Sequence, residues 1–160
     1  MLLSNHRLLV PIVALLAALT VASIPASGPL ARRTGTGRGV TFLFLLGVAG
    51  VLSVTLPFDI RYYGFLSCAV QNPFQTASVR EPQNYLNAVL YFPAAFFGHL
   101  AFRRAFTVTA VLATGSASIE ILQMFGERAC STTDVAFNVL GGVAGVTAAQ
   151  VLVTLRGSTV

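Results

Sequence analysis

Five long apolar segments dominate this sequence and constrain its fold more than any other feature. They cover residues 8–24, 40–56, about 85–102, 106–125 and 135–155. Each is close to the ~20 residues that a helix rising ~1.5 Å per residue needs to cross a hydrocarbon core. With 55% hydrophobic residues, 9% charged residues and a mean hydropathy of +0.78, the chain is too apolar for a soluble domain of its size. We therefore predict an all-α, polytopic integral membrane bundle of about five transmembrane helices, forming a single domain over residues 1–160.

The arginines predict the orientation of these helices. The connections after the first, third and fifth segments hold six of them, namely Arg32, Arg33, Arg38, Arg103, Arg104 and Arg156. By the positive-inside rule this side is cytoplasmic. The sequence thus predicts a multi-pass protein of a bacterial cytoplasmic membrane, with its N-terminus outside and its C-terminus in the cytoplasm. The first segment also fits a cleaved signal peptide, with small residues over 26–28, but cleavage would put three of these arginines outside.

Two other functions that basic or glycine-rich segments can indicate, nucleic-acid binding and phosphate binding, fit this sequence less well. A net charge of +5 suggests a nucleic-acid partner, but the arginines form no stripe, so no nucleic-acid binding is expected. Membrane lipid headgroups explain them better. The glycine-rich stretch over residues 35–39 lacks the lysine of a phosphate-binding loop, and we interpret it as a flexible turn.

The two cysteines fall on the same predicted side of the membrane. Cys68 lies in the loop between the second and third segments, and Cys130 lies between the fourth and fifth. That side is oxidising, so a disulfide between them is one possibility. The other is a pair of unpaired thiols near the lipid headgroups. Neither has the neighbours of a metal site, and no metal is predicted.

Polar side chains recur on one face of each of the last two segments. The fourth carries Thr109, Ala113, Ser116, Glu120 and Gln123 at helical spacing, and the fifth carries Asp134, Asn138, Gly141 or Gly142, and Gly145. The small-x-x-x-small spacing of the glycines permits close helix packing, so we expect the two faces to meet. Glu120 would lie ~8 Å below the outer end of its helix. The acidic and amide side chains would then share one polar cavity at the outer side, with Arg128 over its mouth.

The order of these polar residues resembles that of a known family. The pattern is Asn84-x-x-Asn87, Pro93, Glu120-x-x-Gln123, Arg128, Asp134-x-x-x-Asn138 and Gly141-Gly142. It resembles the signature of the VanZ-like membrane proteins over roughly residues 84–145. Members are small bacterial multispanning proteins, and the name-giving member is associated with low-level teicoplanin resistance. The resemblance implies a role in the cell envelope and does not fix a reaction.

An ionisable side chain at membrane depth usually marks a functional site. Glu120 and Asp134 are candidate catalytic residues, as an acid and a base, and Arg128 is suited to an anion such as a lipid phosphate. The candidate ligand-binding residues are Glu120, Gln123, Arg128, Asp134, Asn138, Asn84 and Asn87. No cofactor is predicted, and His6 and His99 fall on opposite sides of the membrane.

Four functions remain open at this point. The polar cluster would bind a lipid-linked envelope precursor or a glycopeptide, act as an intramembrane acid/base enzyme on such a precursor, or only clamp helices together. A transport subunit is the fourth reading, although five helices without an internal repeat argue against a complete transporter in one chain.

Overall fold

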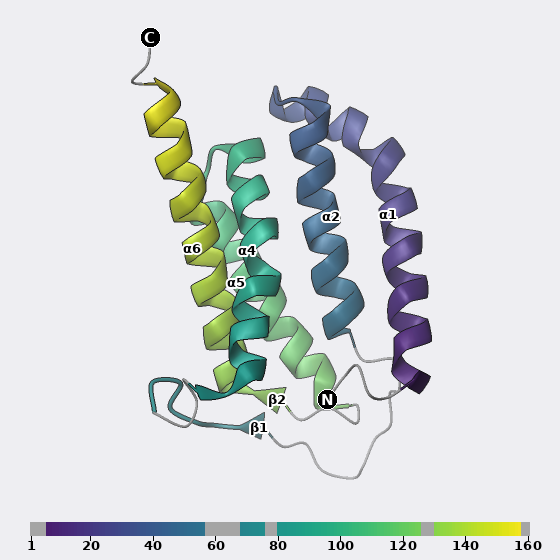
Figure 1. Ribbon diagram of the computed structural model, residues 1–160, viewed down its shortest axis with the longest axis vertical. Helices are drawn as coiled ribbons and strands as arrows, with labels where there is room; N and C mark the ends of the chain where they lie inside the picture. Colours follow the sequence, from purple (N-terminus) through teal and green to yellow (C-terminus); the bar gives the residue numbers. More distant parts are fainter. Residues whose placement is uncertain (1–5, 57–67, 76–79, 126–129, 158–160) are drawn as a thin grey trace.

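A computed structural model describes residues 6–56, 68–75, 80–125 and 130–157 of the chain, and it places five long helices in one bundle (Figure 1). The elements are α1 (His6–Thr34), α2 (Arg38–Thr55), β1 (Cys68–Ala69), α4 (Pro82–Phe102), α5 (Ala105–Gln123), β2 (Cys130–Ser131) and α6 (Thr132–Gly157). All five helices are long and apolar enough to cross a membrane. The predicted all-α membrane bundle is confirmed.

The helices alternate in direction, so the bundle has two chemically different ends. The α1–α2 and α4–α5 connections and the end of α6 lie together at one end, called here the arginine end because it holds the six arginines named above (Figure 1). The strands β1 and β2 lie at the opposite end, called here the strand end.

Helix α4 is the centre of the bundle, because it packs against α6 most extensively and against α2 next. Glycines permit both approaches. A Cβ atom built on Gly141 would overlap the backbone of Ala88, one on Gly145 would overlap Phe92 O, and one on Gly47 would lie 2.8 Å from the backbone of Ala94. The backbones of three helices therefore touch through small residues, as expected when helices associate without a hydrophobic driving force.

This packing corrects one part of the sequence interpretation. The glycine face of the last helix was expected to meet the fourth segment, which is α5, but Gly141 and Gly145 face α4 instead. The spacing of small residues predicts which face of a helix packs closely, but it does not predict which helix packs against that face. Ala88 and Ala95 give α4 its own small-residue surface at a spacing of seven, and that surface accepts α6.

Helix α1 continues to Thr34, ten residues beyond its predicted end, so that predicted boundary is wrong. Pro25 and Pro29 both lie inside the helix. Polar groups reinforce this stretch, since Ser27 Oγ and Arg38 Nη2 donate to Ile24 O at 2.8 and 3.1 Å. The helix bends over the arginine end toward α2 (Figure 1), as prolines in a spanning helix allow.

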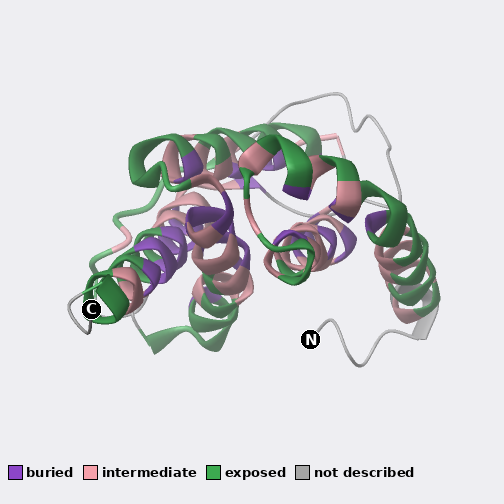
Figure 2. Ribbon diagram, turned by 90° about the horizontal axis from the view of Figure 1, so that it is seen from above, coloured by how far each residue is buried: buried purple, intermediate pink, exposed green. Residues whose placement is uncertain are grey.

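Buried residues lie on the faces that the helices turn toward one another, and exposed residues lie on the outer faces (Figure 2). Tyr91 is among the largest fully buried side chains, and it packs with Val51, Ala94 and Ile119 from three helices. The polar residues described below adjoin this core.

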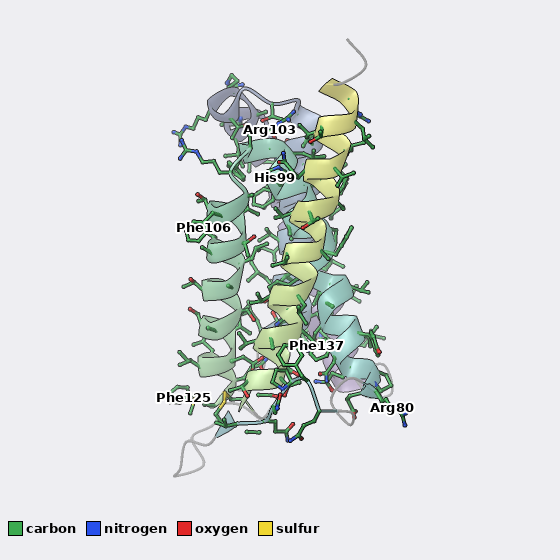
Figure 3. The ribbon with its side chains drawn as sticks, turned by 90° about the vertical axis from the view of Figure 1, so that its left-hand side faces the viewer. Arg80, His99, Arg103, Phe106, Phe125 and Phe137 are labelled. Atoms are coloured by element: carbon green, nitrogen blue, oxygen red, sulfur yellow. A yellow bond between two sulfur atoms is a disulfide. The ribbon has the colours of Figure 1, made fainter. Side chains whose placement is uncertain are left out.

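The strand end is closed by a short parallel pairing of β1 with β2, in which Cys68 is opposite Cys130. These cysteines form a disulfide with their Cα atoms 4.5 Å apart (Figure 3). Thr132 Oγ1 adds a hydrogen bond to Ala69 O at 3.3 Å and accepts one from Gln71 N at 3.1 Å. The loop before α4 is therefore fastened to the start of α6.

We expect Gly141→Ala to destabilise the protein, whereas Gly142→Ala should not. The first substitution pushes a methyl group into the backbone of α4, and overpacking of this kind costs about 1–3 kcal/mol. At Gly142, an added Cβ meets nothing within 4 Å, so this neighbour is the matched control. The unfolding temperature in detergent is the measurement. Equal unfolding temperatures for the two variants would contradict the close approach of α4 and α6.

Breaking the disulfide should destabilise the strand end. A Cys68→Ser, Cys130→Ser double variant loses a crosslink that closes a separation of 62 residues, and such a loss costs about 2–4 kcal/mol. The oxidised protein should also migrate differently on a gel with and without reductant. Unchanged mobility together with full labelling of both thiols would show that the cysteines are unpaired.

Candidate functional site

Glu120 is a buried carboxylate near the end of α5, with 5% of its surface exposed. Its Oε2 atom accepts a hydrogen bond of 2.7 Å from the backbone N–H of Ser131, immediately before the first residue of α6. The N-terminus of a helix carries a partial positive charge, so the carboxylate and the start of α6 attract each other. Glu120 thus links α5 to the β2–α6 junction.

Asn138 lies on α6 and reaches the same face of α5. Its Nδ2 atom donates to Ser116 Oγ at 2.9 Å, and the contact is buried. Ser116 also hydrogen-bonds with Tyr91 of α4, and Tyr91 interacts electrostatically with Glu120. Polar groups of α4, α5 and α6 therefore converge one turn inward from Glu120.

Gln123 connects α5 to a different helix. Its Nε2 atom donates to the backbone carbonyl of Thr55, the last residue of α2, at 2.7 Å. Both the side chain and its contact are buried. This bond fastens the strand-end portions of α2 and α5 to each other.

Asp134 is less enclosed than predicted. It lies in the first turn of α6, is half-buried, and accepts a weak hydrogen bond of 3.4 Å from the exposed side chain of Gln83. Glu120, Gln123 and Asn138 are 4–5% exposed and turn into the bundle, as the sequence suggested. Asp134 differs because it begins the helix, where the outer surface of the bundle is near.

The remaining predicted site residues come from α4 and from a loop. Asn84 is buried in the first turn of α4, and Asn87 is half-buried one turn later. The spacing of seven between Asn84 and Tyr91 puts both on one helix face. Arg128, predicted to cover the site, lies outside the described residues.

Two buried polar atoms in this region have no hydrogen-bond partner among the described residues. They are Asn138 Oδ1 and Thr133 Oγ1, in side chains that are 4% and 3% exposed. The oxygen and nitrogen of an amide can be exchanged without changing its shape, but in either orientation one end of Asn138 stays unpaired. An unpaired buried polar group costs about 1–3 kcal/mol, so a ligand or water that satisfied it would be favoured.

The described residues contain no group of three His, Cys, Asp or Glu side chains that could hold a metal ion. His99 lies near the arginine end, between α4 and α6 (Figure 3), and its Nε2 atom is 2.7 Å from Gln150 Oε1. It is thus remote in sequence and position from the Glu120 cluster. The side chain of His6 lies outside the described residues.

Three residues of this cluster, Tyr91, Thr55 and Ser131, were not predicted from the sequence. Tyr91 had one usable signal, its helical spacing from Asn84. The backbone groups of Thr55 and Ser131 had none, since any residue carries a carbonyl and an N–H.

Comparison with known proteins gives a match to one protein family. No curated protein and no solved structure has significant similarity to the chain. The family model described as VanZ/LLP1 matches residues 9–153, nearly the whole chain. The chain therefore belongs to the VanZ/LLP1 family and is a multi-pass membrane protein of the cell envelope.

Proposed function

We propose that this protein binds a lipid-linked envelope precursor or a glycopeptide at a polar site that opens at the strand end. Glu120, Asn138 and Ser116 form the floor of the site, and Asn84, Asn87, Gln123 and Asp134 surround it. Arg128 pairs with an anionic group of the ligand, such as a lipid phosphate.

The observation that carries this proposal is the unpaired amide oxygen of Asn138, which is buried, as is the unpaired Oγ1 of Thr133 in the first turn of the same helix. Both are acceptors, and the threonine hydroxyl is also a donor. A sugar hydroxyl or a peptide N–H supplies the complementary donor, and both groups occur in glycopeptides and in lipid-linked envelope precursors. A purely structural cluster gains nothing from leaving such an acceptor unpaired.

The proposal includes an orientation. The arginine end faces the cytoplasm of a bacterium, in keeping with the positive-inside rule, and the strand end faces outside. The disulfide supports this arrangement, because disulfides persist in oxidising compartments. An outward site is accessible to an extracellular glycopeptide.

Two alternatives have support of their own. In the first, Glu120 and Asp134 act as an acid and a base on a lipid-linked precursor, since one carboxylate is buried and the other is half-exposed. In the second, the cluster is only a clamp. The bonds from Ser131 to Glu120 and from Gln123 to Thr55 favour the clamp, because each joins two elements.

Fusions to a reporter enzyme that is active only outside the cytoplasmic membrane test the orientation. Activity is expected after Gly126, which follows α5 in the sequence, and none is expected after Arg104 or Arg156. The positive-inside rule is the physical reason. The reverse pattern would place the polar site in the cytoplasm and end the proposal of an extracellular ligand.

Glu120→Gln separates binding from clamping. The glutamine keeps an acceptor for the Ser131 N–H but loses the charge, so a binding site should lose function while the protein stays folded. A clamp should instead lose stability, because hydrogen bonds to charged groups contribute about 1.5–3 kcal/mol. Teicoplanin tolerance of a host that depends on this protein should be measured beside the amount of folded protein and its unfolding temperature.

Glu81→Gln is the matched control for this experiment. Glu81 is an exposed acid at the same end of the bundle and makes no side-chain capping bond at the start of α4. It should behave as the wild type in both measurements.

Asp134→Asn should give a mixed result, since Asp134 also interacts favourably with the dipole of α6. Full tolerance in the Glu120→Gln variant would exclude a functional role for this carboxylate.

A further inference from the structure

An elongated cavity of about 670 Å³ occupies the space between α2 and α5. Its volume is within the range of small-molecule sites, ~300–1,000 Å³. Helix α4 packs against both α2 and α5, whereas α2 and α5 contact each other mainly at the strand end, through Gln123 and Thr55, so α4 forms the back of the cavity. The lining of the cavity differs from the Glu120 cluster in polarity, because apolar side chains make up most of it.

The length of the cavity matches one leaflet of a membrane. On α5 its lining residues recur at helical spacing from Thr107 to Ile119, a distance of ~18 Å at 1.5 Å per residue. Half of a hydrocarbon core is ~15 Å. The cavity begins at the arginine end and extends past the middle of the bundle, where Tyr91 and Ser116 line it, to Leu52 of α2 and Ile119 of α5.

The cavity also opens sideways, toward the surface that lipids would cover. Val111 lines it and is 64% exposed, and Phe106 at the start of the same helix is 85% exposed and points away from the bundle (Figure 3). In a spanning helix, apolar residues exposed in this way contact acyl chains. A lipid therefore has lateral access to the cavity.

Two cations stand at the arginine end of the cavity. Arg33, in the last turn of α1, and Arg104, between α4 and α5, both line it and are both exposed. The sequence has no Asp or Glu over residues 1–58, 82–119 or 135–160, which include every helix segment at this end. The described residues at this end thus offer no acidic side chain to these two arginines, so an anionic ligand can pair with both.

The cavity has a long apolar lining, an opening toward the lipids and two arginines at its mouth. From these features we infer that it binds one anionic phospholipid of the leaflet at the arginine end. The phosphate lies between Arg33 and Arg104, and one acyl chain follows the α5 lining toward Tyr91. This site meets the proposed ligand site at Tyr91 and Ser116, but its cationic mouth is at the opposite end of the bundle, and the inference does not depend on the proposed function.

Titration of the purified full-length protein with phosphatidylglycerol and with phosphatidylcholine in a neutral detergent tests this inference. Bound lipid is counted by native mass spectrometry. One phosphatidylglycerol should bind in preference to phosphatidylcholine, and Arg33→Gln with Arg104→Gln should weaken its binding roughly thirtyfold, at about 1 kcal/mol per arginine. Arg32→Gln with Arg103→Gln removes the same charge from neighbouring positions outside the cavity lining and should have a much smaller effect.

A second pair of variants tests the apolar part without changing charge. Gly115 lines the cavity, and an added Cβ there meets nothing within 4 Å. Gly115→Leu should therefore fill the cavity and abolish specific binding, while Thr114→Leu, on the exposed neighbouring position, should not.

Three outcomes would overturn the assignment. They are equal binding of the two lipids, equal losses from the two arginine pairs, and unchanged binding in Gly115→Leu. A parallel titration uses a polyprenyl phosphate, which shares the phosphate chemistry. Saturable binding of that lipid in place of phosphatidylglycerol, with the same dependence on Arg33 and Arg104, would also refute a bilayer phospholipid as the occupant.

Discussion

The close approach of α4 and α6 through Gly141 and Gly145 is the contact on which the rest of the structure depends. Backbone atoms of the two helices touch there, so neither helix can slide past the other without a clash. The resulting register sets His99 of α4 beside Gln150 of α6 near the arginine end. It also brings Asn138 of α6 to the level of Tyr91, where Ser116 of α5 connects them.

The strand end stabilises a carboxylate, that of Glu120, at membrane depth. An ionised group taken out of water is costly unless it is paired or hydrogen-bonded. Glu120 is held by the N–H of Ser131, and Ser131 directly follows a disulfide-bonded cysteine in a paired strand. The covalent link between the loop and β2 therefore also fixes the donor that Glu120 requires. Reduction of the disulfide would loosen that donor, and this connects the redox state of the strand end to the candidate site.

The sequence predicted the parts of this structure that depend on one helix at a time. Glu120, Gln123 and Asn138 were predicted to face inward because polar side chains in an apolar helix avoid lipid. Partners were harder to predict. Gln123 bonds to the backbone of Thr55, which no side-chain pattern indicates, and the glycine face of α6 meets α4 because Ala88 and Ala95 complete it. The end of α1 was predicted ten residues too early, because the predicted segment covered only the apolar run over residues 8–24, whereas the helix continues through Pro25 and Pro29 to Thr34.

Charge is divided between the two ends of the bundle, and this division separates the two proposed sites. The acids that the structure describes, Glu81, Glu120 and Asp134, all lie toward the strand end, while the described residues of the arginine end include six arginines and no acid. A ligand with hydroxyl and amide groups suits the strand end, and a lipid phosphate suits the arginine end. The cavity lining and the Glu120 cluster share only Tyr91 and Ser116. Substitutions at Arg33 and Arg104 therefore leave the polar cluster intact, and Glu120→Gln leaves the mouth of the cavity intact, so each site is open to test without disturbing the other.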